Sequence, residues 1–505
     1  MHVKERLSVM ERFTAGNIKI DGICNTDVLL EWEITAEVNN HCYMEYTGLI
    51  RNKDTAHAAL KSKLSNNTIR CYVHNTLVFC GYPTFLDITD NVDTCIIHVI
   101  AISFTKNLDV YPSDYFFQDV SQSYANTIEK AFGKHNGALI STAGNTQIGK
   151  PILQYRETSW QYALRISSKL GVVLTPNKLS NLPQACLGIS NGTKREVSNI
   201  FKVLTQQSFY SLMQRDNWYQ DTVPGDFQCY RLEDEKLFNL GDRIILENSE
   251  LSVVRLNNKL INGIIVNNYA IGKERLFAPP LFENEKQVGL SLEGVVIDVC
   301  GEELKLRLDI PDDANNNKAY WFYFSPETCN GMYSMPPRNT RVALEWKNSS
   351  DGDARVIRCV RVRESLREYE YRSLKTEYGK VMEMMPDKVA YFSDSNTLLL
   401  NKGIRKSTEK RMRIKAKKNV MQQSHLFVRY KTPEELAFAK ANTPSSMLMS
   451  AQEIHVKSPA TTTASGSTKP ATFIPAREIF PGVTVNQDVA MKISGMRPVA
   501  TSMGE

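Results

Sequence analysis

The stretch Glu31-Trp-Glu-Ile-Thr-Ala-Glu-Val38 decides the fold class of the first part of the chain. Its apolar residues alternate strictly with charged or polar ones, and a period of two places the two kinds on opposite faces of a β-strand. One face is therefore buried and the other lies in water. Asn39-Asn40 then favours a turn, and Tyr43-Met-Glu-Tyr46 returns as a second strand. The beginning of the chain is thus predicted to be rich in β-structure.

Further short strands follow this stretch along the chain. Residues 69–79 predict a hairpin, 95–104 is a strongly β-branched strand, and the β pattern returns over 238–271. Short strands separated by turn signals are typical of a barrel or a sandwich. We therefore expect two barrel-like domains, over residues 1–150 and 151–280.

One helix interrupts the β pattern in each of these two domains. Ser121 can cap a helix near 121–132 that ends at Gly133, and Thr158 or Ser159 can cap a second helix near 159–170. Apolar residues recur on the second helix at helical spacing, which predicts one buried face. The residues expected in the core from this helix are Trp160, Leu164 and Leu170.

Pro279-Pro280 marks a boundary, after which the pattern becomes wholly β. Five short strands are expected within 287–363, which suits a small closed barrel of the OB type.

The part of the chain after this block is repetitive. Segments 412–420 and 447–456 resemble each other, and strands this thin cannot bury a face within one chain. We therefore expect a β stem over 364–457 that is completed by neighbouring chains. Residues 458–505 are expected to be a linker and a weakly structured tail. The residues expected in the core of the stem are Met412, Ile414, Ala416, Leu448 and Ala451.

Composition narrows the class of protein. At 505 residues the chain is long enough for about three domains. Its net charge of +6 is small for this length, whereas proteins that neutralise many phosphates are usually far more basic, so the charge gives only weak evidence about nucleic acid. The ten cysteines are scattered without a CxxC pair, which favours reduced thiols. The N-terminus has no long apolar run after its charges, and the longest run, 94–102, is about half of a membrane span. We expect a protein made in the cytoplasm without a signal peptide.

Motifs of catalysis and ligand binding are weak. Gly144-Asn-Thr-Gln-Ile-Gly-Lys-Pro151 nearly matches a phosphate-binding loop, but Pro151 has neither the hydroxyl that holds magnesium nor a backbone N–H. Asp312-Asp313 follows a proline and is interpreted as a solvated turn. The eight histidines lack the short spacings of metal ligands, although folding can bring distant ligands together. No catalytic, cofactor-binding or metal-binding residue is predicted.

Residues 402–418 form the sharpest charge feature, with nine basic side chains against one acidic residue. Such a segment could contact nucleic acid or a membrane surface. From 411 to 417 basic residues alternate with apolar ones, and this alternation favours the wet face of a β-strand instead.

Several motifs, in one order along the chain, resemble those of VgrG-like hub–spike proteins, also called late control protein D in phage tails. Gln154-Tyr-Arg-Glu-Thr-Ser-Trp160 resembles the signature of that family. Residues 102–121 resemble the strand that leads into its first helix, and Phe238-Asn-Leu-Gly-Asp242 resembles a strand of its second hub domain. Thr376-Glu-Tyr-Gly-Lys-Val-Met-Glu-Met-Met-Pro-Asp387 resembles its β stem.

The resemblance implies a mainly β fold with a few helices, built of two barrel-like hub domains, an OB-fold barrel and a trimeric β stem. It implies a homotrimer that joins an inner tube protein and baseplate wedge proteins to a spike, with a spike-tip protein or effector cargo at the end. It implies a puncturing device directed at a target cell envelope, in a tail-like particle that is released or delivers outside the cell. Neither a cofactor, a specific nucleic acid nor a catalytic residue is implied.

Two other functions stay open at this point. One is an OB-fold protein that binds single-stranded nucleic acid, although few basic residues flank the aromatic residues at 320–324. The other is a spike-linked cell-wall hydrolase, for which the stretch between Cys359 and Thr376 is too short to hold a catalytic domain.

Overall fold

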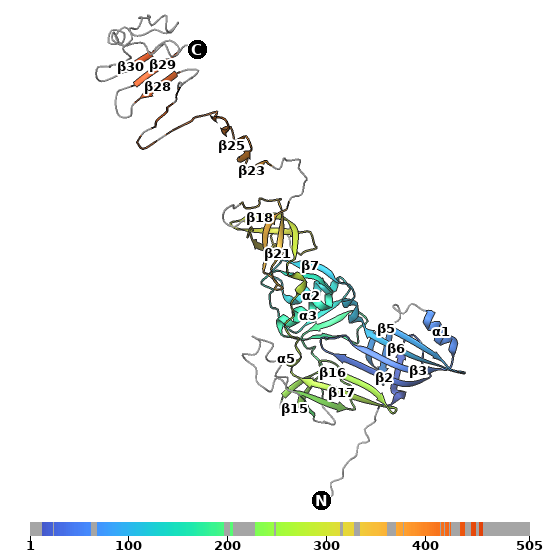
Figure 1. Cartoon of the computed structure of the whole chain (residues 1–505). Helices are drawn as coiled ribbons and strands as arrows, with labels where there is room; N and C mark the ends of the chain where they lie inside the picture. The colour runs from blue at the N-terminus through green and yellow to red at the C-terminus, as the bar shows by residue number, and fades with distance from the viewer. Residues whose placement is uncertain are drawn as a thin grey trace, which may run out of the picture. The chain divides into compact units, whose positions relative to one another are not determined.

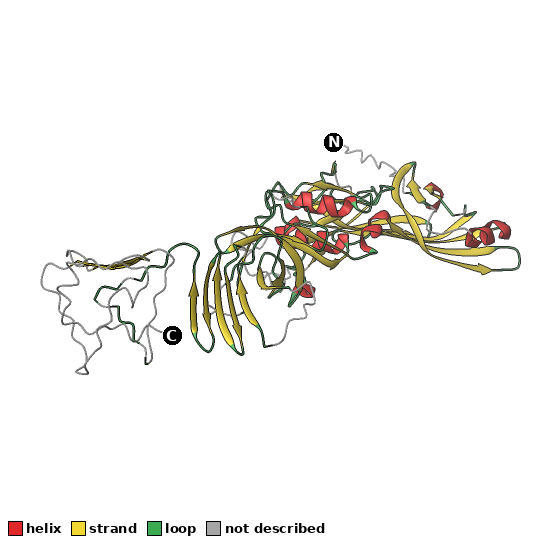
Figure 2. Ribbon diagram, turned by 90° about the horizontal axis from the view of Figure 1, so that it is seen from above, coloured by secondary structure: helices red, strands yellow, loops and turns green. Residues whose placement is uncertain are grey.

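The computed structural model of the chain is mainly β with a few helices, as the sequence predicts (Figures 1 and 2). The chain divides into two compact units, Met1–Arg367 and Glu368–Glu505. None of the helices in the described part of the chain is long and apolar enough to span a membrane. The structure describes residues 13–457 except 24, 62–67, 196–202, 206–227, 247–248, 314–316, 328–333, 361–369, 377, 415, 419, 424, 426–434, 440–445 and 451–453.

One large sheet dominates the first unit. Its 12 strands include ten in the order β1-β4-β5-β6-β3-β2-β16-β17-β14-β13, while β15 pairs with β16 and with β12. The helix α1 (Lys53–Lys61) contacts β5 and β6. The strands are β1 (Ile18–Asp21), β2 (Val28–Glu37), β3 (Tyr43–Ile50), β4 (Ile69–Val73), β5 (Thr76–Asp90), β6 (Cys95–Ser103), β12 (Lys194–Arg195), β13 (Val203–Thr205), β14 (Cys229–Asp234), β15 (Arg243–Leu246), β16 (Ser249–Ile261) and β17 (Ile264–Gly272).

The large sheet crosses the boundary that the sequence suggests between two hub domains. β2 and β16 pair antiparallel, with Thr35 opposite Asn257 (Figure 1). The alternation in β2 is the expected one, since Trp32, Ile34 and Ala36 are all buried in the core of this sheet. Two halves of the sheet from distant parts of the sequence therefore share one hydrophobic core.

A pair of helices forms a second core in the first unit. α2 (Tyr124–Gly133) is capped by Ser123, whose side chain accepts a hydrogen bond from the N–H of Asn126. The predicted cap, Ser121, instead donates to Asp119 at 2.5 Å. Thr158 caps α3 (Ser159–Leu170), which ends at Gly171. Around the pair lie η3 (Phe104–Asp109), β7 (Ser113–Phe117), β8 (Ala138–Ser141), β9 (Ile152–Glu157), β10 (Leu174–Pro176) and β11 (Gln184–Leu187). The short helix α5 (Glu274–Phe277) contacts β16 of the large sheet.

A small closed sheet completes the first unit, and we call it the small barrel. Its order is β20-β19-β18-β21-β22, and a bridge between Phe324 and Val356 brings its first and last strands together. The short helix η5 (Glu285–Gln287) precedes it. The strands are β18 (Ser291–Cys300), β19 (Glu303–Leu308), β20 (Trp321–Tyr323), β21 (Arg341–Trp346) and β22 (Ala354–Cys359).

The second unit contains two antiparallel sheets, one of five strands and one of three. The five strands follow one another as a meander in which each pairs with the next. The meander consists of β23 (Arg372–Lys375), β24 (Val381–Met385), β25 (Lys388–Ser393), β26 (Asn396–Leu400) and β27 (Ile404–Ser407). The smaller sheet consists of β28 (Glu435–Ala439), β29 (Ser446–Ser450) and β30 (Ile454–Lys457).

These strands differ from the repeat expected in the sequence. The described residues between 408 and 420 belong to no strand, and segment 447–456 is divided between β29 and β30. Like charges at alternate positions from 411 to 417 repel one another along one face, and Ala416 offers little surface to bury on the other. The alternation alone is therefore not enough to form a strand among the described residues of this segment, and its described charges at Arg411, Arg413 and Lys417 do not lie on a strand.

Candidate functional site at the junction of two hydrophobic cores

Strand β7 joins the core of the helix pair to the core of the small barrel. Phe116 belongs to the barrel core, where its ring centroid lies 6.0 Å from that of Phe322 and 5.8 Å from that of Trp346. Phe117 belongs to the helix-pair core and stacks on Tyr162 at 5.4 Å. Successive residues of a strand point to opposite faces, so one strand anchors both cores.

Strand β9 repeats this arrangement. It pairs with β7, and Phe116 lies opposite Leu153 while Phe117 lies opposite Ile152. Leu153 belongs to the barrel core and Ile152 to the helix-pair core. The two strands thus form a shared wall. We call this wall, with the polar contacts across it, the barrel joint.

Arg165 of α3 is the main polar contact of the barrel joint. Its guanidinium donates to both carboxylate oxygens of Glu157, at 2.8 and 2.9 Å, and to the carbonyl of Leu153 at 2.9 Å. It also donates to Oδ2 of Asp351, in the loop between β21 and β22 of the small barrel, at 2.6 Å. Arg165 is only 1% exposed, so this network is held away from water. Charge-assisted bonds of this kind fix geometry as well as contributing energy.

Asp351 carries its charge in this buried position. Burial raises the pKa of its carboxyl, but the charges of Arg165 and Lys169 outweigh burial and hold the pKa below its usual range. Lys169 also donates to Asp351. Arg165 and Lys169 of α3 therefore both bind the carboxylate of Asp351 in the small barrel.

Gly352 allows the loop of the small barrel to approach this closely. Its φ is +84°, a conformation that side chains rarely adopt. A Cβ at this position would lie 2.7 Å from Cβ and 2.6 Å from Cδ of Lys150. The joint therefore requires a residue without a side chain beside Asp351.

Asp313 makes the second polar contact of the barrel joint. Its carboxylate accepts from the backbone N–H of Gln118 at 2.9 Å, from Gln122 at 2.5 Å and from Lys130 at 2.9 Å. Its side chain is only 5% exposed. The interpretation of Asp312-Asp313 as a solvated turn is therefore wrong. The partners of Asp313 lie almost two hundred residues earlier, which no local pattern reveals.

The residues that the sequence assigns to a core lie in different surroundings. Trp160 is 3% exposed and its ring lies 4.5 Å from that of His41, while Leu164 and Leu170 are half-buried beside the helix-pair core. In the second unit, Met412 is 51% and Ile414 61% exposed within one chain. Ala416 is exposed, Leu448 is half-buried, and Ala451 lies outside the described residues.

The meander of the second unit has an apolar face that the described residues of the chain leave partly exposed. In an antiparallel sheet, directly paired residues share a face, so the register assigns each side chain. Ala390, on the opposite face, is the sole buried apolar residue among the described residues of this unit. The register places Arg372 and Lys406 on this face as well, one on each edge strand of the meander. We call this face the apolar face because its other residues on these strands are apolar: Leu374, Met382, Met384, Val389, Tyr391, Leu398, Leu400 and Ile404.

The near-match to a phosphate-binding loop, Gly144–Pro151, is followed by strand β9 and not by a helix. The loop therefore lacks the helix N-terminus that such a site uses. Its Lys150 packs against Gly352 of the barrel joint, which gives it a structural contact.

No protein-family profile matches this sequence, and no curated protein matches it. Solved structures do match. One is E. coli c3393, a component of the type VI secretion system described as similar to T4 tail proteins gp27 and gp5. It has 12% identity and a TM-score of 0.49, covering 68% of this chain and 99% of that one.

Two further matches have the same character. The lidded Francisella PdpA–VgrG complex has 10% identity and a TM-score of 0.47, covering 77% of this chain and 80% of that one. A 43 kDa tail protein of prophage MuSo2 from Shewanella oneidensis has 12% identity and a TM-score of 0.41, covering 52% of this chain and 99% of that one. The chain is similar to tail and secretion-system proteins. This is the class that its sequence motifs resemble.

Proposed function

We propose that the protein is a structural hub–spike subunit that works as a homotrimer at the tip of the inner tube of a contractile injection system or phage tail-like particle. The first unit serves as the hub, with the small barrel as its OB domain, and the second unit forms the stem of the spike. The observation that carries this proposal is the apolar face of the meander.

The apolar face needs a partner because water solvates it poorly. Tyr391, Met384 and Leu374 are 41%, 40% and 46% exposed, and Ile404 is 75% exposed. Burying one such side chain contributes about 1.5–3 kcal/mol. The opposite face of the meander carries charged residues such as Lys375, Glu383 and Arg405 among its apolar ones, so the two faces differ in polarity.

A second and third copy of this chain are the occupants that suit the apolar face. The face extends over all five strands from β23 to β27, with one cation on each edge strand, Arg372 and Lys406, so a copy of the chain brings a surface of the same length and polarity. Packing around a three-fold axis covers all three faces at once and leaves the charged faces in water. The three meanders then share one apolar core along the axis and form a stiff column, which a spike needs.

The barrel joint supports the same role. A spike transmits axial force only if it does not pivot on its hub. Here a shared apolar wall, the Arg165 network and the Asp313 contacts connect the small barrel to the helix pair at separate points. Domains that move relative to each other usually share small, polar interfaces. The joint instead continues a hydrophobic core from one domain to the next.

The remaining partners follow from this role. The hub of a trimer caps the inner tube protein and contacts baseplate wedge proteins, and the stem presents a spike-tip protein or effector cargo to the target envelope. The particle assembles from chains made in the cytoplasm and is released or delivers outside the cell. The role needs stiffness and no catalytic residue, so we assign the protein no enzymatic activity.

The alternative function, binding of single-stranded nucleic acid by the small barrel, is disfavoured because most of the aromatic residues that could stack on bases are not exposed. Phe322 and Phe324 are buried in the barrel core, while Trp321 lies under the ammonium of Lys305 at 4.9 Å. Tyr323, with its hydroxyl bonded to Glu302, is the one that is largely exposed among the aromatic residues of 320–324. A stacking platform requires several exposed rings beside cations.

The decisive experiment measures the mass of the full chain in solution by light scattering. We expect the mass of a trimer of this chain at micromolar concentration. Leu398→Asp places a charge on the apolar face and should dissociate the trimer, whereas Thr397→Asp places it on the opposite face of the same strand and should not. A monomeric parent chain, or equal behaviour of the two variants, would contradict the proposal.

A further inference from the structure

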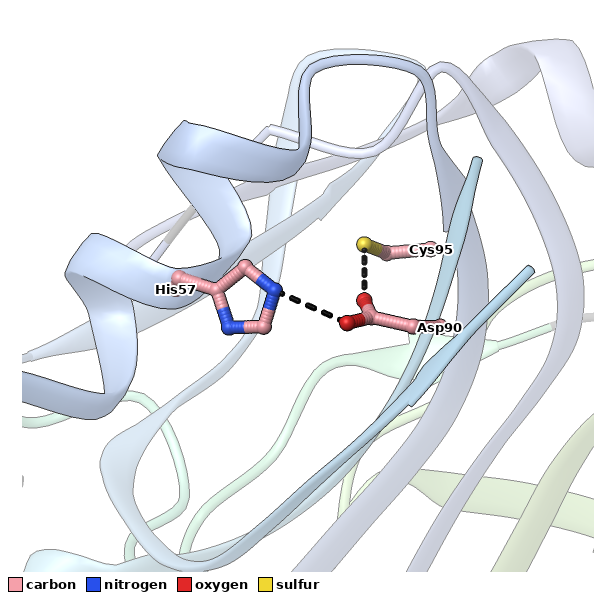
Figure 3. Close-up of side chains that lie close together, drawn as sticks. All are labelled: His57, Asp90 and Cys95. Carbon is pink, nitrogen blue, oxygen red and sulfur yellow. Dashed lines mark hydrogen bonds and ion pairs between the residues drawn. The ribbon is translucent and has the colours of Figure 1, made fainter. Parts of the chain in front are cut away.

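Three side chains that can ligate a metal ion meet at one end of the large sheet in the first unit. His57 lies on α1, Asp90 ends β5 and Cys95 begins β6 (Figure 3). Nε2 of His57 lies 3.1 Å from Oδ2 of Asp90, and the thiol of Cys95 donates to Oδ1 of Asp90 at 2.8 Å. The three ligand atoms lie within 4.8 Å of one another.

Two backbone features hold these groups in place. Asp90 and Cys95 are paired across the β5–β6 hairpin, whose turn is closed by a bond from the N–H of Asn91 to the carbonyl of Thr94 at 2.9 Å. Lys53, one turn before His57 on α1, donates to the carbonyls of this turn, among them Val92 at 2.8 Å. The helix is therefore tied to the hairpin, and His57 faces Asp90.

We propose that His57, Asp90 and Cys95 bind one divalent ion of the zinc class, which clamps α1 to the β5–β6 hairpin. The ligand set selects the metal. A thiolate and an imidazole favour zinc over magnesium or calcium, which prefer oxygen. At bonds of about 2.0–2.3 Å to zinc, ligand atoms stand somewhat further apart than the two hydrogen-bonded pairs of Asp90, so small adjustments of the three side chains make room for the ion.

The surroundings suit an ion that arrives from solvent. His57 and Asp90 are 44% and 49% exposed, while Cys95 lies buried at the base of the site. The open side leaves a fourth position for a water molecule, as in zinc sites with three protein ligands. The charge of Lys53 acts on the carboxylate of Asp90, and the turn carbonyls already hold its ammonium.

Binding exchanges a proton for the ion. The Sγ–H bond of Cys95, which now points at Asp90, breaks, an Sγ–metal bond forms, and the proton passes to the buffer. His57 binds through neutral Nε2, and Asp90 binds as a carboxylate. Two negative charges then balance the two positive charges of the ion, so the site closes without net charge.

Cobalt(II) tests this site because a cobalt–thiolate bond absorbs in the near ultraviolet and tetrahedral cobalt in the visible. The full chain, prepared without a histidine tag, is titrated with Co²⁺ and then with Zn²⁺ as competitor. We expect a thiolate band that saturates at one ion per chain and disappears when zinc is added. Calorimetry with Zn²⁺ should give the same stoichiometry.

Matched variants locate the signal. Cys95→Ser and His57→Ala should each abolish the thiolate band at a cobalt concentration that saturates the parent chain, and each should weaken zinc binding at least tenfold. Cys300→Ser removes an exposed thiol elsewhere, and His98→Ala removes another histidine that pairs with a carboxylate, Glu45, so both should bind normally. His57 is partly exposed on a helix, so its variant should fold even if the Cys95 variant does not.

The contrary results are equally definite. Absence of a thiolate band in the parent chain, or a band that persists in the His57→Ala variant, would overturn the proposal. A band that disappears in the Cys300→Ser variant would assign the binding to a surface thiol. In each case the three side chains would simply satisfy one another by hydrogen bonds.

Discussion

Arg165 is a single side chain whose removal should loosen the barrel joint. Arg165→Ala leaves the carboxylates of Glu157 and Asp351 buried without their shared cation, which costs about 3–5 kcal/mol for a broken buried pair. We expect a clear drop in the melting temperature of the first unit, measured by calorimetry. Lys19→Ala removes an exposed pair with Asp21 and should leave the melting temperature almost unchanged. Equal melting temperatures for both variants would show that the network is unimportant.

His41 gives the same unit a dependence on pH. Burial lowers the pKa of His41 to about 4, and although Asp109 raises it, burial outweighs that contribution. The unfolded chain, with a histidine pKa of about 6.5, takes up this proton first as the pH falls. Stability is therefore fully present above pH ~6.5 and is lost as the pH falls toward 4, by about 3 kcal/mol from this residue.

The free energy of unfolding of the parent chain and of histidine variants is measured by chemical denaturation at several pH values. His41→Asn should flatten the decline between neutral pH and pH ~4, because no proton is taken up on unfolding at that position. His98→Asn makes the same substitution at a partly exposed histidine and serves as the matched variant. A parent chain whose stability does not decline over this interval would refute the assignment of a neutral, buried His41.

At the level of elements, the loop between β21 and β22 depends on a residue without a side chain. Gly352→Ala should strain the left-handed backbone by about 1–2 kcal/mol and also force Lys150 away. Gly301→Ala is the matched control, because Gly301 has a φ of +58° in another barrel turn with nothing within 4 Å of the added Cβ. Thermal unfolding should show a larger decrease in melting temperature for Gly352→Ala than for Gly301→Ala. A smaller or equal decrease would mean that the loop and Lys150 can move aside without cost.

Local elements of the fold could be predicted where local forces determine them. The alternation of Trp32, Ile34 and Ala36 predicts β2 because every second residue meets the same core. Thr158, one of the two caps expected from the sequence, and Gly171 mark the limits of α3, because a hydroxyl cap and a left-handed glycine satisfy helix ends in any context.

Other features depend on partners far along the chain and could not be predicted. Phe116 and Phe117 look alike in sequence, yet each enters a different core. Arg165 stands out as a charge among apolar helix positions, which is a usable signal, but nothing local indicates Asp351 as its partner. The described residues of 412–420 form no strand, because period-two alternation describes how a strand would face and not whether a neighbour exists to pair with it.

For the whole molecule, we expect the first unit to fold without the second unit, and the second unit to be needed for trimer formation. A chain that ends after Arg367 keeps the large sheet, the helix pair and the small barrel, so it should fold with the melting temperature of the first unit. Without the meander it lacks the apolar face and should be mainly monomeric by light scattering. A truncated chain that still forms stable trimers would place the contacts between copies in the first unit.

The pairing of β2 with β16 has a consequence for synthesis on the ribosome. Asn257 bonds to Thr35 across a sequence separation of 222 residues. At about 5–20 residues per second, translation takes on the order of 10–40 s to cover that distance. Throughout this interval the outer edge of β2 has no partner strand, and an open edge is a template for joining another chain. We therefore expect the yield of native subunits to depend on how well the free edge of β2 is shielded during this interval, for example by a holdase chaperone.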